Sequence, residues 1–244
     1  MARLTGRVAL ITGGGSGVGL ATARLFLKEG AKVAIAGRTA EKIRKAAESL
    51  GGGANLLALT CDVAIPDQVA ALVRDTTAKF RRIDILVNNA GMNIKNRTMR
   101  EMTPETWRTM LAANLDGAFY CTSAVLPQMR DRKDGVIINI NSIAGKRSGP
   151  LGGVSYNAAK FGMAALGICV GAEEKDNGIR TCNIYPGEID TPILEHRPTP
   201  VTDDHRKQIL QAEDVAEAVL FVALLPPRAS VPELVIKPTT QVYI

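Results

Sequence analysis

Two side chains that could transfer a proton, Tyr156 and Lys160, stand four residues apart in the stretch Ser155–Lys160. Residues with this spacing lie on one face of a helix, one turn from each other. An ammonium near a phenol favours the phenolate, so we expect Lys160 to lower the pKa of Tyr156 toward the working pH. A phenol tuned in this way can donate or accept a proton beside a carbonyl or an alcohol. The alternative is a surface pair without function, which any helix can carry.

A third polar group, Ser142, follows the aliphatic run Gly135–Ile140, which predicts a buried strand. A glycine-rich segment, 145–153, then leads into a helix that begins near Tyr156 and runs to about Lys175. A side chain at the end of a strand and one at the start of the next helix can converge. We therefore expect Ser142 and Tyr156 to hold one ligand oxygen between them.

A dinucleotide site is predicted near the N-terminus, where a strand (7–12), a glycine-rich loop (13–19) and a helix (20–29) follow one another. Glycines let the backbone approach a pyrophosphate closely, and the N-terminus of the helix offers free N–H groups and the positive end of its dipole. A flexible turn is the alternative, but the order of strand, loop and helix favours phosphate binding.

The end of the second predicted strand, Lys32–Gly37, distinguishes between the two nicotinamide dinucleotides. An acidic residue about 20 residues past the glycines would accept a bond from the ribose 2′-hydroxyl of the adenosine. Gly37 and Arg38 occupy this place, and a guanidinium can bind a 2′-phosphate through a forked, charge-assisted contact. The pattern favours NADP(H) over NAD(H), with a solvated Arg38 as the alternative.

Polar residues also follow the third and fourth predicted strands. Asp62 and Val63 come directly after the third strand, and Asp62 could accept a bond from an adenine amino group or cap the following helix. The fourth strand ends in the run Asn88–Gly91, whose small and amide side chains permit close approach of a cofactor. Asn88 could instead tie neighbouring strand ends together.

One amide, Asn114, stands among apolar residues in a stretch predicted to be helical to about Arg130. A buried amide needs hydrogen-bond partners. We therefore expect Asn114 to hold either a bent helix turn or a chain of water molecules.

A segment after the sixth predicted strand could close over a substrate. Pro186 and Gly187 turn the chain, and residues 188–204 are rich in proline, threonine and charge, which is typical of a mobile lid. The expected walls of the substrate pocket are 93–99, 145–154 and 188–203. Three charged side chains there could contact a polar substrate, although solvation is the favoured interpretation: Glu188, His196 and Arg197.

The composition indicates one α/β domain, 1–244, with an aliphatic core. Of the 244 residues, 46% are hydrophobic but only 4% are aromatic, and the formal net charge is +6. The basic residues are scattered and do not alternate with aromatics, which argues against nucleic-acid binding. The repeated alternation of strand and helix continues without a linker.

The cysteines and histidines give little support to a metal site. The four cysteines form no CxxC pair and the chain has two histidines, so we expect no metal and four buried, free thiols. No apolar leader and no run of ~18 apolar residues occurs. We expect a cytoplasmic protein that does not contact the membrane.

Six motifs occur in a fixed order; each is weak alone, and together they are highly specific. They are Thr12-Gly13-x3-Gly17-x-Gly19, Asn88-Asn89-Ala90-Gly91, Asn114, Ser142, Tyr156-x3-Lys160 and Pro186-Gly187. The set resembles the short-chain dehydrogenase/reductase family over roughly residues 6–225. The resemblance implies a Rossmann-type doubly wound sheet of about seven parallel strands, with helices on both faces. It also implies metal-free, NAD(P)-dependent carbonyl/alcohol oxidoreduction in a homotetramer or homodimer, with the helices near 114–130 and 156–175 as the interface.

The resemblance also implies a role for each matching residue. Tyr156 would be the general acid in reduction and the base in oxidation, and Ser142 would hold the substrate oxygen beside it. Lys160 would bond the nicotinamide ribose and lower the pKa of Tyr156, while Asn114 would support a water in a proton relay. The other implied contacts are all to the dinucleotide: Gly13, Ser16, Gly17, Val18 and Gly19 at the phosphates, Asp62 and Val63 at the adenine, Asn89, Ala90 and Gly91 along the adenosine half, Pro186 and Gly187 in the last turn, and Ile189 and Thr191 at the carboxamide.

Two positions depart from the family pattern. Asn141 stands where many members carry a second serine, and Ser16 stands where some NADP-dependent members carry a basic residue, so the phosphate preference rests mainly on Arg38. We expect an NADP(H)-dependent reductase or dehydrogenase for a small carbonyl/alcohol substrate. A non-catalytic dinucleotide sensor is the alternative, although such proteins usually lose the tyrosine or the lysine. A sugar epimerase or dehydratase is disfavoured, because little chain follows Gly187.

Overall fold

The computed structural model forms a seven-stranded parallel sheet with the strand order β3-β2-β1-β4-β5-β6-β7. Residues 2–242 are described. The strands are β1 Val8–Thr12, β2 Lys32–Gly37, β3 Leu56–Thr60, β4 Ile85–Asn88, β5 Gly135–Ile140, β6 Ile179–Pro186 and β7 Glu233–Ile236. The predicted doubly wound, Rossmann-type sheet is therefore confirmed.

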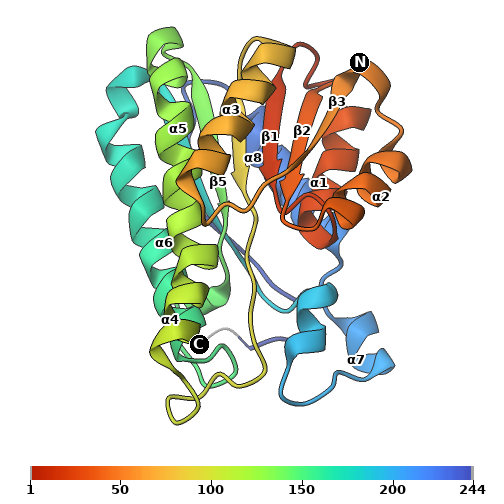
Figure 1. Ribbon diagram of the computed structural model, residues 1–244, viewed down its shortest axis with the longest axis vertical. Helices are drawn as coiled ribbons and strands as arrows, with labels where there is room; N and C mark the ends of the chain where they lie inside the picture. The colour runs from red at the N-terminus through yellow and green to blue at the C-terminus, as the bar shows by residue number, and fades with distance from the viewer. Residues whose placement is uncertain (1, 243–244) are drawn as a thin grey trace.

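Helices cover both faces of the sheet. They are α1 Gly17–Lys28, α2 Ala40–Leu50, α3 Pro66–Phe80, α4 Pro104–Leu111, α5 Gly117–Arg132, α6 Val154–Glu173, α7 Asp203–Gln208 and α8 Ala212–Leu224. Helices α1, α2 and α8 pack on one face, and α3, α5 and α6 pack on the other (Figure 1). Since all strands run in one direction, their carboxyl ends share one edge, which faces downward in Figure 1, toward α4 and α7. Within residues 2–242, no helix is long and apolar enough to cross a membrane.

Successive residues of β1 supply two separate hydrophobic cores. Ala9 and Ile11 pack with Phe26 of α1 and with α8, whereas Val8 and Leu10 pack with α3 and α5. Neighbouring side chains of a strand point to opposite faces. Because both faces are covered, the central strands are uninterrupted aliphatic runs in the sequence.

Three buried asparagines form a ladder across β4, β5 and β6. The Nδ2 group of Asn88 donates to Oδ1 of Asn139 at 3.0 Å, and Asn139 donates in the same way to Asn183 at 3.0 Å. Asn183 then donates to the carbonyl of Ala164 in α6 at 3.0 Å. The ladder ties three strands and one helix together, so the structural alternative for Asn88 is the one observed.

Three local predictions are refined or corrected. Asn114 lies in a π-helical turn, Ala112–Asp116, between α4 and α5, so the bent-turn alternative is observed. The segment predicted to be a mobile lid contains regular structure: a 3-10 turn, Pro192–His196, and the start of α7. Cys169 is exposed on α6, whereas the other three cysteines are buried; the expectation of four buried thiols was wrong because Cys169 lies on the outer face of that helix.

Candidate active site

The two hydroxyl groups predicted to hold a substrate oxygen meet at the carboxyl edge of the sheet. Ser142 follows β5 and begins a 3-10 turn, Ile143–Gly145, where its Oγ accepts the N–H of Ala144 at 3.1 Å. Tyr156 is the third residue of α6, and its hydroxyl is hydrogen-bonded to Ser142. The strand end and the helix start therefore bring these side chains together.

Lys160 lies one turn further along α6 and is only 3% exposed. Its Nζ donates to the carbonyl of Ile140 at 2.8 Å, and lies 3.7 Å from Sδ of Met163 and 5.7 Å from the centre of the Tyr156 ring. No carboxylate within residues 2–242 forms an ion pair with it. Burial lowers the pKa of Lys160 to about 7, so the ammonium loses its proton far more readily than an exposed lysine does.

The predicted lowering of the Tyr156 pKa by Lys160 is not found. Burial raises the pKa of Tyr156, and the hydrogen bond with Ser142 and the charge of Arg97 oppose this only in part. The physical reason is that Lys160 is itself desolvated and directs its Nζ to a backbone carbonyl. The cation that favours the phenolate here is Arg97, which the sequence placed only in a pocket wall.

Asn141 fixes the end of β5 to α6. Its Nδ2 donates to the carbonyl of Lys160 at 3.1 Å, and its Oδ1 accepts the N–H of Ser142 at 2.9 Å. One buried side chain thus sets the spacing between Ser142 and the helix that carries Lys160. Sequence reasoning treated Asn141 only as a replacement for serine; its position directly before Ser142 was the available signal.

Asn114 uses its whole amide inside the protein. Its Oδ1 accepts the N–H of Met92 at 3.0 Å, and its Nδ2 donates to the carbonyls of Met92 at 3.0 Å and Met110 at 2.9 Å. Both N–H groups of the amide are thereby used. Asn114 therefore fixes the loop after β4 to the π-helical turn. Its role in a proton relay stays a prediction.

The glycine loop after β1 has the form of a phosphate cradle. Gly13 and Gly17 adopt positive φ angles of 66° and 52°. A Cβ on Gly19 would lie 2.4 Å from the carbonyl oxygen of Gly13 and 2.5 Å from Nδ2 of Asn89, so no side chain fits there. Ser16 is the N-cap of α1 but makes no side-chain cap bond, which leaves the first N–H groups of this helix, Val18 among them, to a ligand. These features fit the pyrophosphate of a dinucleotide.

Thr12 and Asn89 join the ends of β1 and β4 beside this cradle. The Nδ2 of Asn89 donates to the carbonyls of Thr12 at 2.9 Å and Gly13 at 3.2 Å. The hydroxyl of Thr12 accepts the N–H groups of Asn89 and Ala90, each at 3.0 Å. The run 89–91 therefore lies against the glycine loop, where the side chain of Asn89 supports the loop backbone, and its contact with the adenosine half stays a prediction.

Arg38 is exposed and directly follows β2. Its Nη2 lies 3.9 Å from Sδ of Met92, the residue that Asn114 holds. Gly37 beside it is closely packed, because a Cβ there would lie 3.0 Å from the side chain of Ile43. The guanidinium is therefore exposed and lies next to the loop after β4.

Asp62 and Val63 differ in what they offer to a ligand. The Oδ1 of Asp62 accepts the N–H of Ala64 at 3.0 Å, which is a local turn and not a helix cap, since the N-cap of α3 is Ile65. Val63 is buried, and a Cβ on Gly117 of α5 would lie 2.5 Å from its side chain. Asp62 stays a candidate for the adenine contact, whereas the Val63 side chain packs beneath it.

The chain after β6 returns to the glycine loop. Pro186 ends β6, and the N–H of Gly187 donates to β7 at 2.8 Å. Ile189 forms an isolated bridge with the segment before α8. Thr191 lies against the loop, because a Cβ on Gly17 would be 3.1 Å from its methyl group. Of the two residues predicted to contact the carboxamide, Thr191 therefore lies next to the glycine loop.

Comparison with known proteins identifies the family. Residues 7–201 match the family model described as short chain dehydrogenase. The chain belongs to this family. An uncharacterized oxidoreductase of Mycobacterium bovis is 36% identical over 225 residues, which is 90% of each chain. An uncharacterized oxidoreductase of Staphylococcus aureus is 33% identical over 239 residues, covering 98% of this chain and all of its own.

Solved structures of similar proteins hold nicotinamide dinucleotides. The closed form of a serine dehydrogenase in complex with NADP+ is 32% identical, with a TM-score of 0.88 and coverage of 97% of this chain and 96% of that one. A 3-ketoacyl-(acyl-carrier-protein) reductase from Brucella melitensis in complex with NADH is 30% identical, with a TM-score of 0.88 and coverage of 96% and 98%.

In this short-chain dehydrogenase, two charged residues of the predicted lid are paired. Nη2 of Arg197 lies 3.2 Å from the carboxylate of Glu188, which also receives Nε2 of His205 at 2.6 Å. The side chains of Arg197 and Glu188 are only 17% and 20% exposed. The favoured interpretation of solvated side chains was wrong for these two, because α7 brings His205 over Glu188; His196 is exposed, as predicted.

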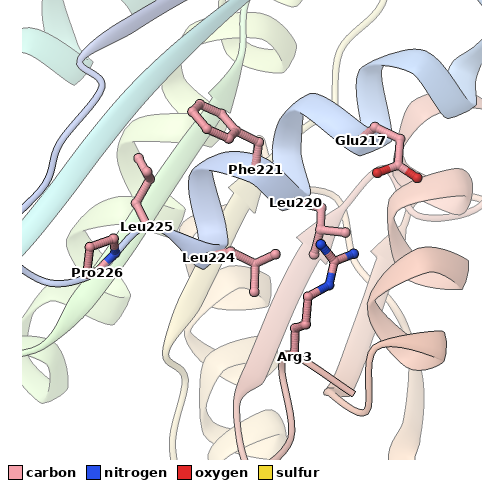
Figure 2. A pocket seen from close by; sticks show the side chains of 7 residues that line it. All are labelled: Arg3, Glu217, Leu220, Phe221, Leu224, Leu225 and Pro226. Carbon is pink, nitrogen blue, oxygen red and sulfur yellow. The ribbon is translucent and has the colours of Figure 1, made fainter. Parts of the chain in front are cut away.

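A hollow lies at the opposite end of the sheet from Ser142 and Tyr156. Figure 2 shows Leu220 and Leu224 of α8 on the side of Arg3, which precedes β1, with Phe221 on the other side of the helix. The hollow therefore lies at the amino edge of the sheet, away from Ser142 and Tyr156. Within residues 2–242, no group of three or more His, Cys, Asp or Glu side chains is arranged to hold a metal ion.

Proposed function

We propose that the chain is an NADP(H)-dependent oxidoreductase that interconverts a carbonyl and an alcohol, with Tyr156 as general acid and base. The observation that carries the proposal is the hydrogen-bonded pair Ser142 and Tyr156, one helical turn from Lys160 and at the sheet edge where the glycine loop opens. The NADP+ and NADH complexes of similar proteins support a nicotinamide dinucleotide as the cofactor.

In this proposal the residues of the chain hold the substrate oxygen and move one proton. The bound dinucleotide supplies a hydride, with its electron pair, to the carbonyl carbon in reduction. The Oγ of Ser142 accepts the Ala144 N–H, which leaves its own proton free to donate to the carbonyl oxygen. Tyr156 gives its hydroxyl proton to that oxygen, so that an alcohol and a tyrosinate result. The charge of Arg97 and the hydrogen bond from Ser142 favour the tyrosinate, and oxidation reverses each transfer.

A dinucleotide-sensing protein without turnover is the second candidate. The observation in its favour is the raised pKa of Tyr156. The phenol therefore stays protonated at neutral pH and cannot act as a base. Binding of NADPH without its oxidation by any carbonyl compound would support this candidate.

The cofactor preference is tested at Arg38. We expect Arg38→Ala to weaken NADPH binding by about 30- to 100-fold, because a charge-assisted bond to the 2′-phosphate is lost. NADH lacks that phosphate, so its dissociation constant should change by less than about threefold, on the same reasoning. Fluorescence titration of the two cofactors measures both effects.

The control for this experiment is Arg44→Ala on α2. Arg44 is also exposed but pairs with Glu41 at 2.8 Å and with Glu48 on its own helix. The Arg44→Ala substitution should leave the dissociation constants of NADPH and NADH unchanged. A wild-type protein that prefers NADH would show that Gly37 and Arg38 have been misinterpreted.

Assembly into a homotetramer or homodimer through α5 and α6 is part of the proposal. Large apolar side chains are exposed on both helices: Phe119 is 51% exposed on α5, and Phe161 and Ile168 are 44% and 50% exposed on α6. Phe161 and Ile168 are two turns apart and share one face of α6. Such a patch would be buried by a second copy of the chain.

We expect light scattering after size-exclusion chromatography to give a mass that is a multiple of 26.0 kDa. The double variant Phe161→Asp/Ile168→Asp should shift this mass down, because burying two carboxylates in the interface is unfavourable. Ile65→Asp, at an exposed apolar residue before α3, is the control and should leave the mass unchanged. A monomeric wild-type protein would contradict the proposed assembly.

A further inference from the structure

Arg97 is a buried cation without an anionic partner. It lies in the loop between β4 and α4 and is only 4% exposed. Its Nη1 donates to the carbonyl of Leu151 at 2.9 Å, and its Nη2 donates to the carbonyl of His196. Its Nε is buried and has no hydrogen-bond partner. A buried charge that is not neutralised costs several kcal/mol, so this arrangement calls for an anion.

The two carboxylates of the segment 188–190, which leads to His196, are already paired with other cations. Glu188 pairs with Arg197 at 3.2 Å and with His205 at 2.6 Å, and Asp190 pairs with Arg206. Within residues 2–242, no carboxylate forms an ion pair with Arg97. Arg197 is near enough to act on Arg97 as a like charge. The positive charge of Arg97 is therefore not neutralised by a carboxylate of the described chain.

The loop that carries Arg97 packs against the start of α6, near the proposed catalytic tyrosine. The charge of Arg97 acts on Tyr156, and its backbone carbonyl accepts the N–H of Val154 at 3.2 Å, two residues before that tyrosine. The loop is closely packed there, because a Cβ on Gly153 would lie 2.6 Å from Cβ of Arg97. Through Leu151 and His196 the same side chain joins the other two predicted pocket walls.

From this geometry we propose that the substrate is an oxo acid or hydroxy acid whose carboxylate binds the guanidinium of Arg97. The inference rests on the proposed function and narrows its substrate class. A guanidinium has five N–H donors, and two of its nitrogens here already bond to carbonyls. The Nε–H has no partner in the chain, and an edge of the planar guanidinium matches the two oxygens of a carboxylate. The carboxylate is unchanged by the reaction; only the neighbouring carbonyl gains hydride and proton.

The test compares acids with their methyl esters. With saturating NADPH, 2-oxo and 3-oxo carboxylates and the corresponding esters are assayed with wild type, Arg97→Gln, Arg97→Lys and the exposed control Arg100→Gln. We expect wild type to prefer acid to ester by about 100-fold in kcat/KM, as a lost charge-assisted pair implies. Arg97→Gln should lower kcat/KM for the acid at least about 20-fold more than for the ester. Arg97→Lys should recover part of the loss, and Arg100→Gln should match wild type.

Two results would overturn this inference while leaving the proposed function intact. One is a wild-type enzyme that reduces esters as well as acids; the other is an equal loss on acid and ester in Arg97→Gln, which would make Arg97 only a clamp between loops. If wild type reduces neither while NADPH binds, ketones and aldehydes without a carboxylate decide the proposed function. Calorimetric titration of malonate and of inorganic phosphate into the NADP+-loaded protein then decides the inference alone. Malonate binding that is lost in Arg97→Gln supports it; no binding, or tighter phosphate binding, overturns it.

Discussion

Tyr156→Phe is expected to lower kcat with NADPH and a carbonyl substrate by about 10³-fold or more, since the proton donor is lost. The ring of Tyr156 is partly buried, and its packing does not depend on the hydroxyl, so the variant should fold and bind NADPH with unchanged affinity. Steady-state kinetics, a cofactor titration and a thermal melt together separate the loss of chemistry from a loss of structure.

The matched control is Tyr120→Phe. Tyr120 is also partly buried, on α5, where its ring packs edge to face on Phe119 at 5.6 Å. Removing its hydroxyl should leave kcat within about twofold of wild type, because surface substitutions without special contacts have small effects. Full activity of the Tyr156→Phe variant would contradict the proposed role of Tyr156 as proton donor.

Lys160→Met is expected to abolish efficient turnover and at the same time to stabilise the fold at neutral and acidic pH. Burial lowers the pKa of Lys160 from an ordinary 10.5 to about 7. Each pKa unit is worth about 1.4 kcal/mol, so holding this ammonium costs the folded state on the order of 5 kcal/mol. The lost bond to Ile140 offsets about 1 kcal/mol of the gain. We expect the free energy of unfolding to rise by about 2–4 kcal/mol at pH 6.

The pH dependence has a definite sign. Between pH 7 and the unfolded value near 10.4, the unfolded chain binds more protons than the folded chain, so wild-type stability rises with pH in this window. The advantage of Lys160→Met should therefore shrink to about 1 kcal/mol or less by pH 10. Guanidinium denaturation at several pH values measures it, with the exposed Lys42→Met as the pH-independent control. A variant that is destabilised throughout would show that the ammonium supports the fold.

The elements of the fold could be predicted because their signals are local. The aliphatic run of β1, Pro66 at the first position of α3, and Gly51 with its positive φ of 59° after α2 each lie within a few residues of the boundary they mark. The short helix α7 was not predicted, although Thr202 caps it locally by accepting the N–H of His205. Its place in the fold depends on ion pairs to distant residues, such as that of His205 with Glu188.

The candidate site was predictable in its positions but not in its electrostatics. Helical spacing placed Lys160 beside Tyr156, and the end of β5 placed Ser142. The pKa of Tyr156 depends instead on burial and on Arg97, which comes from a loop far away in sequence. Asn141 likewise acts through contacts to Lys160 and Ser142 that only the packing of β5 against α6 creates.

Hydride transfer itself can be followed with NADPH that carries deuterium at both C4 positions. The wild-type protein is incubated with this cofactor and a carbonyl compound, first a 3-oxo acid, and the alcohol is analysed by mass spectrometry. The proposal predicts oxidised cofactor and an alcohol with one deuterium on the former carbonyl carbon, both missing with Tyr156→Phe. Cofactor that binds but stays reduced with oxo acids, esters, ketones and aldehydes would contradict the oxidoreductase proposal and favour a dinucleotide-sensing protein.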